Sequence, residues 1–466
     1  MADVQILKYC VDNEWRESTT DKYMDVTDSS TGEVFAKAPC CTAAEVTAAI
    51  ESANAAFPAW SGMPAQKRTQ VLYRWKTILE QHEDELAYMC SRELGKNLDE
   101  ARGEIVKIIE GCEVGVTVPM TAKGESLMNV STGHDTVSYR EPLGVFAGIA
   151  PFNFPAMIPF GWMIPLAIAT GNTFVLKAAS LVPTTGIRLL ETLIEAGLPK
   201  GVVNLVTCSR NEAEIMMTHP AIRGVSFVGS TSVGKHVYSI AAAHGKRVQA
   251  QTEAKNHGLV LEDASLERAA AGIINSTFGC AGMRCMALPV CVVQNSVADE
   301  FIGYMKKFAQ ERVVGCSYDP KTELGPVVSA EHQKFVKDWI TKGVEERVAD
   351  NFRDRSWDYH LRFNVYGRDG VMADLEPTPS TSGVHELGIV IEATAETQEQ
   401  ADTICAFARS TMLHYGYTGR RATAGNLAFP YSPSDCHIGA VYVFSVYHLL
   451  AVDDPAAHFP IEIVEL

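Results

Sequence analysis

The fold is decided by residues 144–180, which read GVFAGIAPFNFPAMIPFGWMIPLAIATGNTFVLKAAS. Val145–Ala150 is a short apolar run that predicts a buried strand, and Thr173–Ala178 is a second such run. Met157–Ala169, between them, is long enough to form a helix. A strand, a helix and a strand in this order predict a βαβ unit of a parallel sheet.

The same stretch carries no charged residue from Gly144 to Leu176, a length that also fits a membrane span. Prolines interrupt it, however, and each would leave backbone groups unpaired in lipid. They are Pro151, Pro155, Pro159 and Pro165. We therefore expect a buried strand, loop and helix, and no membrane segment.

The alternation of strands and helices continues toward the C-terminus. Helices are predicted over 184–196, 212–218 and 232–243, and strands over 202–208 and 224–228. A further α/β unit follows, with strands over 258–261 and 289–293 and helices over 266–278 and 299–313. This pattern predicts an α/β fold with a doubly wound parallel sheet and a second α/β domain.

The flanking segments are less regular. Thr42 and Glu45 form a capping box before a helix, more helix runs from 64 to 116 with a break near Gly95, and residues 125–139 suggest a hairpin. Residues 347–380 are rich in Arg, Asp, Pro, Ser and Thr, which predicts a linker or irregular region. Beyond it we expect a strand over 387–393, a helix up to residue 413 that begins with a capping box of Thr397 and Gln400, and an apolar strand over 441–447.

Composition excludes several classes of function. The chain has 466 residues and a net charge of −16, which disfavours nucleic acid and anionic membranes as partners. The N-terminal residues resemble neither a secretory signal nor a transit peptide. The 12 cysteines form no Cys-x-x-Cys pair, so we expect reduced thiols, no metal site and a cytoplasmic protein.

A candidate nucleophile lies in residues 278–285, which read FGCAGMRC. Cys285 follows a predicted helix among small residues, and the neighbouring Arg284 would lower the pKa of its thiol. A single cysteine is more often an inert core thiol, and we interpret Cys280 and Cys291 in that way.

Three other motifs carry a chemical interpretation, and two of them also have a plainer one. Asn153, between two prolines, can donate to a developing oxyanion or simply form a turn. Gly229 and Gly234 join a strand to a helix whose first N–H groups can face a pyrophosphate. Lys177, at a strand end, can meet a ribose or phosphate or merely be solvated.

Together these motifs resemble, in order and spacing, the aldehyde dehydrogenase superfamily over residues 5–346. Glu323-Leu324-Gly325-Pro326 belongs to the same resemblance. Within the superfamily, four segments are similar to the CoA-acylating methylmalonate-semialdehyde dehydrogenase branch. They are residues 147–159, 244–250, 254–257 and 284–288.

The resemblance implies a mechanism. Cys285 attacks the aldehyde carbon, Asn153 and the Cys285 backbone N–H hold the oxyanion, and hydride passes to a nicotinamide, which leaves a thioester on Cys285. It also implies a set of cofactor-binding residues. They are Phe152, Lys177, Ser180, Gly229, Ser230 and Gly234.

One departure from hydrolytic relatives bears on the second half of the reaction. The position of their catalytic glutamate, four residues before Lys255, is occupied by Gln251, which cannot act as a base. Glu253 lies two residues further along and is not expected to replace it. The resemblance therefore implies acyl transfer to coenzyme A, with methylmalonate or malonate semialdehyde giving propionyl-CoA or acetyl-CoA and carbon dioxide.

Two further departures affect specificity. The branch holds the substrate carboxylate with two arginines, and here Arg284 matches one while Lys107 takes the place of the other. Lysine keeps the charge but loses the bidentate fork, so carboxylate recognition should weaken. Ser180 stands where NAD-preferring relatives have a glutamate, so NADP is an alternative to NAD.

The resemblance ends before the last part of the family's catalytic domain. It assigns residues 1–124 and 141–250 to an NAD(P)-binding domain, 125–140 to an oligomerisation hairpin and 251–346 to a truncated catalytic domain. Residues 347–466 are expected to form an unrelated α+β module. The strand that would pair with the hairpin across an oligomer is missing, so the homo-oligomeric state is open.

Residues 356–466 resemble instead the C-terminal region of acyclic terpene utilisation proteins. The segments that carry this resemblance are 385–388, 413–430 and 432–435, and the charged side chains among them suggest either a polar site or a Gly-rich packed loop. Those side chains are His414, Arg420, Arg421 and Asp435. The alternative to an enzyme is a catalytically impaired, cofactor-binding fusion with an interaction module.

Overall fold

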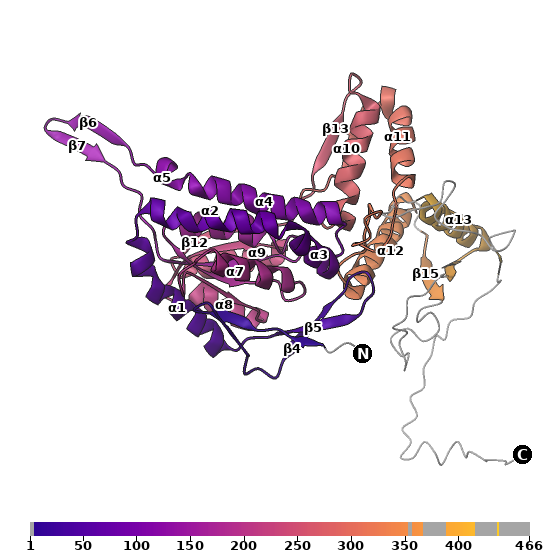
Figure 1. The fold of residues 1–466 in the computed structure, drawn as a ribbon. Coiled ribbons are helices and arrows are strands. Elements are labelled where there is room, and N and C mark those ends of the chain that lie inside the picture. Colours follow the sequence, from indigo (N-terminus) through magenta and orange to yellow (C-terminus); the bar gives the residue numbers. More distant parts are fainter. Residues whose placement is uncertain (1–3, 353–356, 367–387, 415–435, 438–466) are drawn as a thin grey trace, which may run out of the picture. The chain divides into compact units, whose positions relative to one another are not determined.

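The computed structural model describes residues 4–352, 357–366, 388–414 and 436–437. The chain divides into two compact units, one built on residues up to 337 and one on the described residues from 338 onward. Figure 1 shows their elements. Each unit is described by itself.

A seven-stranded sheet forms the centre of the first unit. Its strand order is β12 (Arg247–Gln251), β11 (Ile222–Val228), β8 (Val145–Ile149), β9 (Thr173–Lys177), β10 (Val203–Val206), β2 (Tyr9–Val11) and β3 (Glu14–Arg16). The strands from β12 to β10 are all parallel, whereas β2 and β3 pair antiparallel. The predicted doubly wound parallel sheet is therefore confirmed.

Helices cover both faces of this sheet because successive side chains of a strand point to opposite sides. Phe174 and Leu176 of β9 pack into one core, while Val175 between them packs into the other. The first core lies under α2 (Ala65–Gln81), α4 (Leu98–Val116), α6 (Ile164–Ala169) and α7 (Thr184–Glu195). The second lies under α1 (Ala43–Ser61), α8 (Arg210–Thr218) and α9 (Thr231–Ala243).

The uncharged stretch folds as a buried connection between β8 and β9. It contains a π-helical segment, Met157–Met163, followed by α6. No helix in the described part of the chain is long and apolar enough to cross a membrane. The capping box predicted at Thr42 and Glu45 is present at the start of α1.

The first unit also contains two small sheets whose strands lie mostly between β3 and β8 in the sequence. β1 (Gln5–Ile6), β5 (Val34–Pro39) and β4 (Tyr23–Thr27) form the first. The predicted hairpin is confirmed as β6 (Ser126–Ser131) and β7 (His134–Val137), which follow the short helix α5 (Val118–Thr121). Every residue of the hairpin is exposed, and it projects from the body of the first unit (Figure 1).

The second α/β part of this unit is small. β13 (His257–Val260) and β14 (Val290–Val293) pair in parallel, and α10 (Leu266–Phe278) packs with α11 (Ala298–Gln310) beside them. Two 3-10 segments, η2 (Gly279–Gly282) and η3 (Asn295–Val297), connect these elements.

The segment Glu323–Pro326 docks on the turn between α3 (Glu83–Leu94) and α4. The side-chain amide of Asn97 donates to the carbonyl of Glu323 at 2.7 Å. Gly95 ends α3 with φ +92°, a conformation that favours glycine. A Cβ atom there would lie 2.4 Å from the carbonyl oxygen of Pro326, so close contact and backbone conformation both require glycine.

The second unit corrects one prediction. Residues 347–380 were expected to be irregular, but α12 (Ala330–Phe352) reaches into them and β15 (Tyr359–Tyr366) follows. β15 pairs antiparallel with β16 (Gly388–Ala395), and α13 (Gln398–His414) begins with the predicted Thr397–Gln400 capping box. The polar residues of YHLRFNVY hid its alternation, in which Tyr359, Leu361 and Phe363 turn toward one core.

The remaining predictions for the C-terminal part lie outside the described residues. They concern the strand over 441–447, the segment 415–435 and the side chains of His414, Arg420, Arg421 and Asp435.

We predict that Gly95→Ala destabilises the protein by about 2 kcal/mol or more, because it adds left-handed strain and a clash with Pro326. Urea unfolding followed by fluorescence measures the change. Gly103→Ala is the matched control, since Gly103 is an exposed position of α4 with no atom within 4 Å of an added Cβ. That control should be neutral or raise stability by up to about 1 kcal/mol. Equal effects of the two substitutions would contradict this role of Gly95.

Candidate functional site

The sheet register brings the sequence motifs to one edge. Ile149 at the end of β8 pairs with Lys177 on one side and with Phe227 on the other. The carboxyl ends of parallel strands meet at the same edge, which is where open α/β sheets bind ligands. Asn153 follows β8 and Gly229 follows β11, so both lie at the edge where Lys177 ends its strand.

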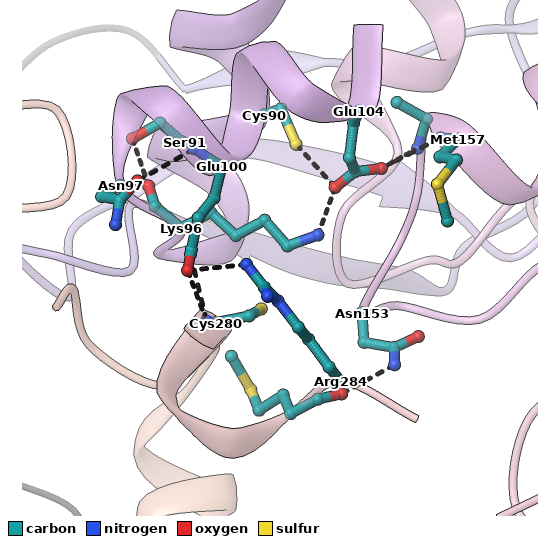
Figure 2. A network of polar contacts seen from close by, with 12 residues as sticks. Cys90, Ser91, Lys96, Asn97, Glu100, Glu104, Asn153, Met157, Cys280 and Arg284 are labelled. Atoms are coloured by element: carbon teal, nitrogen blue, oxygen red, sulfur yellow. Dashed lines mark hydrogen bonds and ion pairs between the residues drawn. The ribbon is translucent and has the colours of Figure 1, made fainter. Parts of the chain in front are cut away.

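Asn153 joins the loop after β8 to the segment that carries the candidate nucleophile. Its side-chain amide donates to the carbonyl of Met283 at 2.7 Å, two residues before Cys285 (Figure 2). Asn256 holds the same segment from the other side, with its amide donating to the carbonyls of Cys285 and Ala287, each at 2.8 Å. These contacts fix the backbone on both sides of the thiol.

Cys285 and Cys280 lie in different surroundings. Cys285 is half-buried, whereas Cys280 is only 2% exposed. Burial raises the pKa of the Cys280 thiol to about 12. A thiol with that pKa is almost wholly protonated at neutral pH, and only the thiolate is a strong nucleophile. The geometry therefore favours Cys285 as the reactive thiol of the pair.

The two cations expected to hold a substrate carboxylate have different partners here. Arg284 donates to Glu100 at 2.8 Å, and this ion pair is partly buried. Lys107 forms an ion pair with Glu110, one turn further along α4, with 2.6 Å between its ammonium nitrogen and a carboxylate oxygen. Both side chains are about half exposed. The structure does not bring Arg284 and Lys107 to one carboxylate.

The N-terminus of α9 already accepts an anion. The Thr231 N–H donates to a carboxylate oxygen of Glu253 at 2.9 Å, and this contact holds the pKa of Glu253 below its usual value. Ser230, the N-cap residue, makes no side-chain capping bond. A carboxylate therefore already occupies an N–H group at the start of this helix, the position where an anion is favoured.

Other predicted cofactor residues lie along the same edge. Burial lowers the pKa of the Lys177 ammonium, which has the thiols of Cys208 and Cys40 nearby. Ser180 is buried just beyond it. The Phe152 ring makes an edge contact with His332, with 5.7 Å between ring centroids.

Sequence reasoning missed the carboxylates that organise this site. Glu100 and Glu104 lie one turn apart on α4, and Lys96 precedes them in the turn after Gly95. Glu104 and Lys96 form an ion pair of 2.5 Å in which each side chain is 1% exposed. Their spacing within residues 95–104 is visible in the sequence, but nothing there shows that the charges are buried. In the described part of the chain, no three metal-ligating side chains cluster as a metal site would require.

Comparisons with known proteins show the family of the chain. A family model described as the aldehyde dehydrogenase family matches residues 15–352. Malonate-semialdehyde dehydrogenase of Listeria monocytogenes serovar 1/2a is 45% identical over 346 residues, which are 74% of this chain and 71% of the relative. The enzyme of the same name from Lacticaseibacillus casei is 42% identical over 344 residues, or 74% and 70% of the two chains.

Solved structures of methylmalonate-semialdehyde dehydrogenases have a similar fold. Methylmalonate-semialdehyde dehydrogenase of Oceanimonas doudoroffii superposes with a TM-score of 0.71 at 33% identity, covering 83% of this chain and 76% of its own. A protein of Sinorhizobium meliloti 1021, assigned the same activity and complexed with NAD, has a TM-score of 0.70 at 36% identity, with coverage of 77% and 71%.

We predict that iodoacetamide at pH 8 alkylates Cys285 at least about tenfold faster than Cys280, because the latter is buried and protonated. Trypsin cleaves after Arg284 and separates the two cysteines, and fragment-ion mass spectrometry distinguishes Cys285 from Cys291 on the same peptide. Denatured protein provides the control, since both thiols should then react at similar rates. Faster labelling of Cys280 in the folded protein would contradict the assignment.

Proposed function

Because the chain belongs to the aldehyde dehydrogenase family, we propose that it oxidises a small semialdehyde to an acyl-CoA, with a nicotinamide dinucleotide as hydride acceptor. The observation that carries the proposal is the contact between Asn153 and the carbonyl of Met283. It places an amide donor beside the chain segment of a half-buried thiol, at the ligand-binding edge of a parallel sheet.

The first half of the reaction uses Cys285 and Asn153. The thiolate of Cys285 forms a bond to the aldehyde carbon, and the carbonyl oxygen becomes an oxyanion. The Asn153 amide and the Cys285 backbone N–H stabilise that oxyanion once the amide turns from Met283 to the substrate. A bound nicotinamide would supply the acceptor for the hydride, and a thioester on Cys285 results.

The second half concerns release of the acyl group. Gln251 is exposed at the end of β12 and cannot take a proton from water. Coenzyme A carries its own thiol, which attacks the thioester carbonyl and returns Cys285 as the leaving group. The lack of a base at position 251 therefore supports transfer to coenzyme A over hydrolysis.

Arg284 supports a substrate that carries a carboxylate. The guanidinium is held at 2.8 Å by Glu100, and its N–H groups that Glu100 does not use can bind a substrate carboxylate. Malonate semialdehyde and methylmalonate semialdehyde both bring such a group close to the aldehyde. Lys107, paired with Glu110 on the surface, would add only a long-range charge.

The dinucleotide site fits NAD and also admits NADP. The N-terminus of α9 would receive a phosphate, and Lys177 ends β9, which is separated from β11 by β8 at the same edge of the sheet. Ser180 brings no negative charge to this edge, so a 2′-phosphate would meet little repulsion there.

We predict that the purified protein reduces NAD or NADP with malonate semialdehyde over many turnovers only when coenzyme A is present, whereas without it reduction stops at about one equivalent per Cys285. Absorbance of the reduced nicotinamide at ~340 nm measures the rate, and Cys285→Ala should lower it at least about 10³-fold because the nucleophile is lost. Cys280→Ala is the matched control and should keep most of the activity, since that thiol is buried and protonated.

The result that would contradict the proposal is a folded protein that binds NAD without turning over any aldehyde. That outcome would favour a cofactor-binding protein without catalysis. Turnover that does not depend on coenzyme A would instead contradict the acyl-transfer step alone.

We also predict that Glu253→Gln strengthens dinucleotide binding about three- to tenfold, because the Glu253 carboxylate competes with phosphate for the α9 N-terminus. Titration of NAD by fluorescence quenching measures the dissociation constant. Glu141→Gln, at an exposed position outside the site, removes the same charge and should change the constant little. Weaker binding in Glu253→Gln would show that Glu253 supports the site.

A further inference from the structure

Helix α4 holds the two chain segments of the candidate site with side chains one turn apart. Residues at i and i+4 of a helix lie on the same face, and here these are Glu100 and Glu104. Glu104 binds the segment that follows Asn153, and Glu100 binds the segment that precedes Cys285. Figure 2 shows both sets of contacts.

Glu104 anchors the backbone of the Asn153 loop. One carboxylate oxygen accepts the N–H groups of Ala156 at 3.2 Å and Met157 at 2.9 Å. The other accepts Lys96 at 2.5 Å and the Cys90 thiol at 3.4 Å. These contacts are made where Glu104 is 1% exposed, so water does not compete for them.

Lys96 makes a second contact with the same loop, at Phe154. Its ammonium lies 3.4 Å from the centre of the Phe154 ring, next to Asn153. Burial by itself lowers the pKa of Lys96, but the Glu104 carboxylate, together with the nearby Cys280 and Cys90, more than offsets this, so the pKa lies above its ordinary value. The charged pair therefore contacts the loop at two places, Lys96 at Phe154 and Glu104 at Ala156 and Met157.

Glu100 holds the thiol segment in the same way. Its two oxygens accept the Cys280 N–H at 3.1 and 3.0 Å, and one of them also accepts Arg284 at 2.8 Å. Asn97, the N-cap of α4, accepts the Glu100 N–H at 2.9 Å and so fixes the start of the helix. The spacing of the two carboxylates is therefore set by a rigid element.

We propose that Glu104, paired with Lys96, is a positioning residue that sets the Asn153 amide relative to the Cys285 thiol through the backbone at Ala156 and Met157. The role in catalysis rests on the proposed function. Without Glu104 two backbone N–H groups lose their acceptor, and the loop is free to move from the register that Asn153 needs. A displacement of about 1 Å is enough to lower a catalytic rate about 10²-fold.

The first test requires no turnover. Hydrogen exchange of the amides in residues 152–160 is compared between the wild type and Glu104→Gln. We expect the exchange of Met157 to be about tenfold faster in the variant, because an amide group replaces the charged acceptor. Glu93→Gln is the matched control, since Glu93 is also fully buried and accepts the N–H groups of Thr184 and Thr185. Unchanged protection in Glu104→Gln would overturn the proposal.

The second test separates positioning from simple stabilisation of the fold. Glu104→Gln should lower kcat about 10- to 100-fold and leave KM for the aldehyde within about threefold. In an Asn153→Ala background the same substitution should cost less than about threefold, because its effect passes through Asn153. Equal losses in both backgrounds would overturn the proposal, as would an equal loss of kcat in Glu93→Gln.

A double variant keeps the tests decisive if Glu104→Gln does not fold. Lys96→Met with Glu104→Leu removes both charges and leaves no unpaired buried ion, so it should lose less stability than a variant that removes only one of the two charges. It still lacks the acceptor for Met157 and should show the same faster exchange and lower kcat. If the wild type proves inactive, the proposed function fails, and the exchange measurements alone decide whether Glu104 holds the loop.

Discussion

The buried ion pair of Lys96 and Glu104 is the interaction on which the rest of the candidate site depends. Two opposite charges at 1% exposure lose nearly all contact with water, and that loss is offset only by good geometry and further hydrogen bonds. The loop after β8 supplies these hydrogen bonds, because two of its backbone N–H groups donate to the Glu104 carboxylate. The same contacts that make the charges tolerable therefore fix the loop that carries Asn153.

Much of the fold follows from the sequence because its signals are strong and local. The apolar strands of residues 145–150 and 173–178 and the helices between strands have the right lengths, and the structure contains them. Tyr359–Tyr366 escaped prediction because its polar alternate residues resemble a loop in composition, and only pairing with β16 makes it a strand. Pairing between distant segments is a tertiary fact that local composition does not encode.

The candidate site divides in the same manner. Cys285, Asn153, Lys177 and the Gly229–Gly234 turn could be proposed from the sequence because each lies at or after the end of a strand or helix, and the register of the parallel sheet brings the last three to one edge. Glu100, Glu104 and Glu253 were not identifiable, since a glutamate in a charged helix or loop is normally solvated. Glu104 is buried, Glu100 contacts residues distant in the sequence, and Glu253 contacts the N-terminus of α9. The hydrogen bond of Arg284 to Glu100 is of the same kind, because it joins residues 184 positions apart.

The small β13–β14 sheet has a consequence for the protein in solution. Parallel strands are ordinarily covered on both faces, yet Leu259 on β13 is 70% exposed and Val292 on β14 is 51% exposed. Exposed apolar strands attract other chains, and the attraction grows with protein concentration. The exposed apolar residues of this sheet therefore favour association as protein concentration rises, against the mutual repulsion of molecules that each carry a net charge of −16.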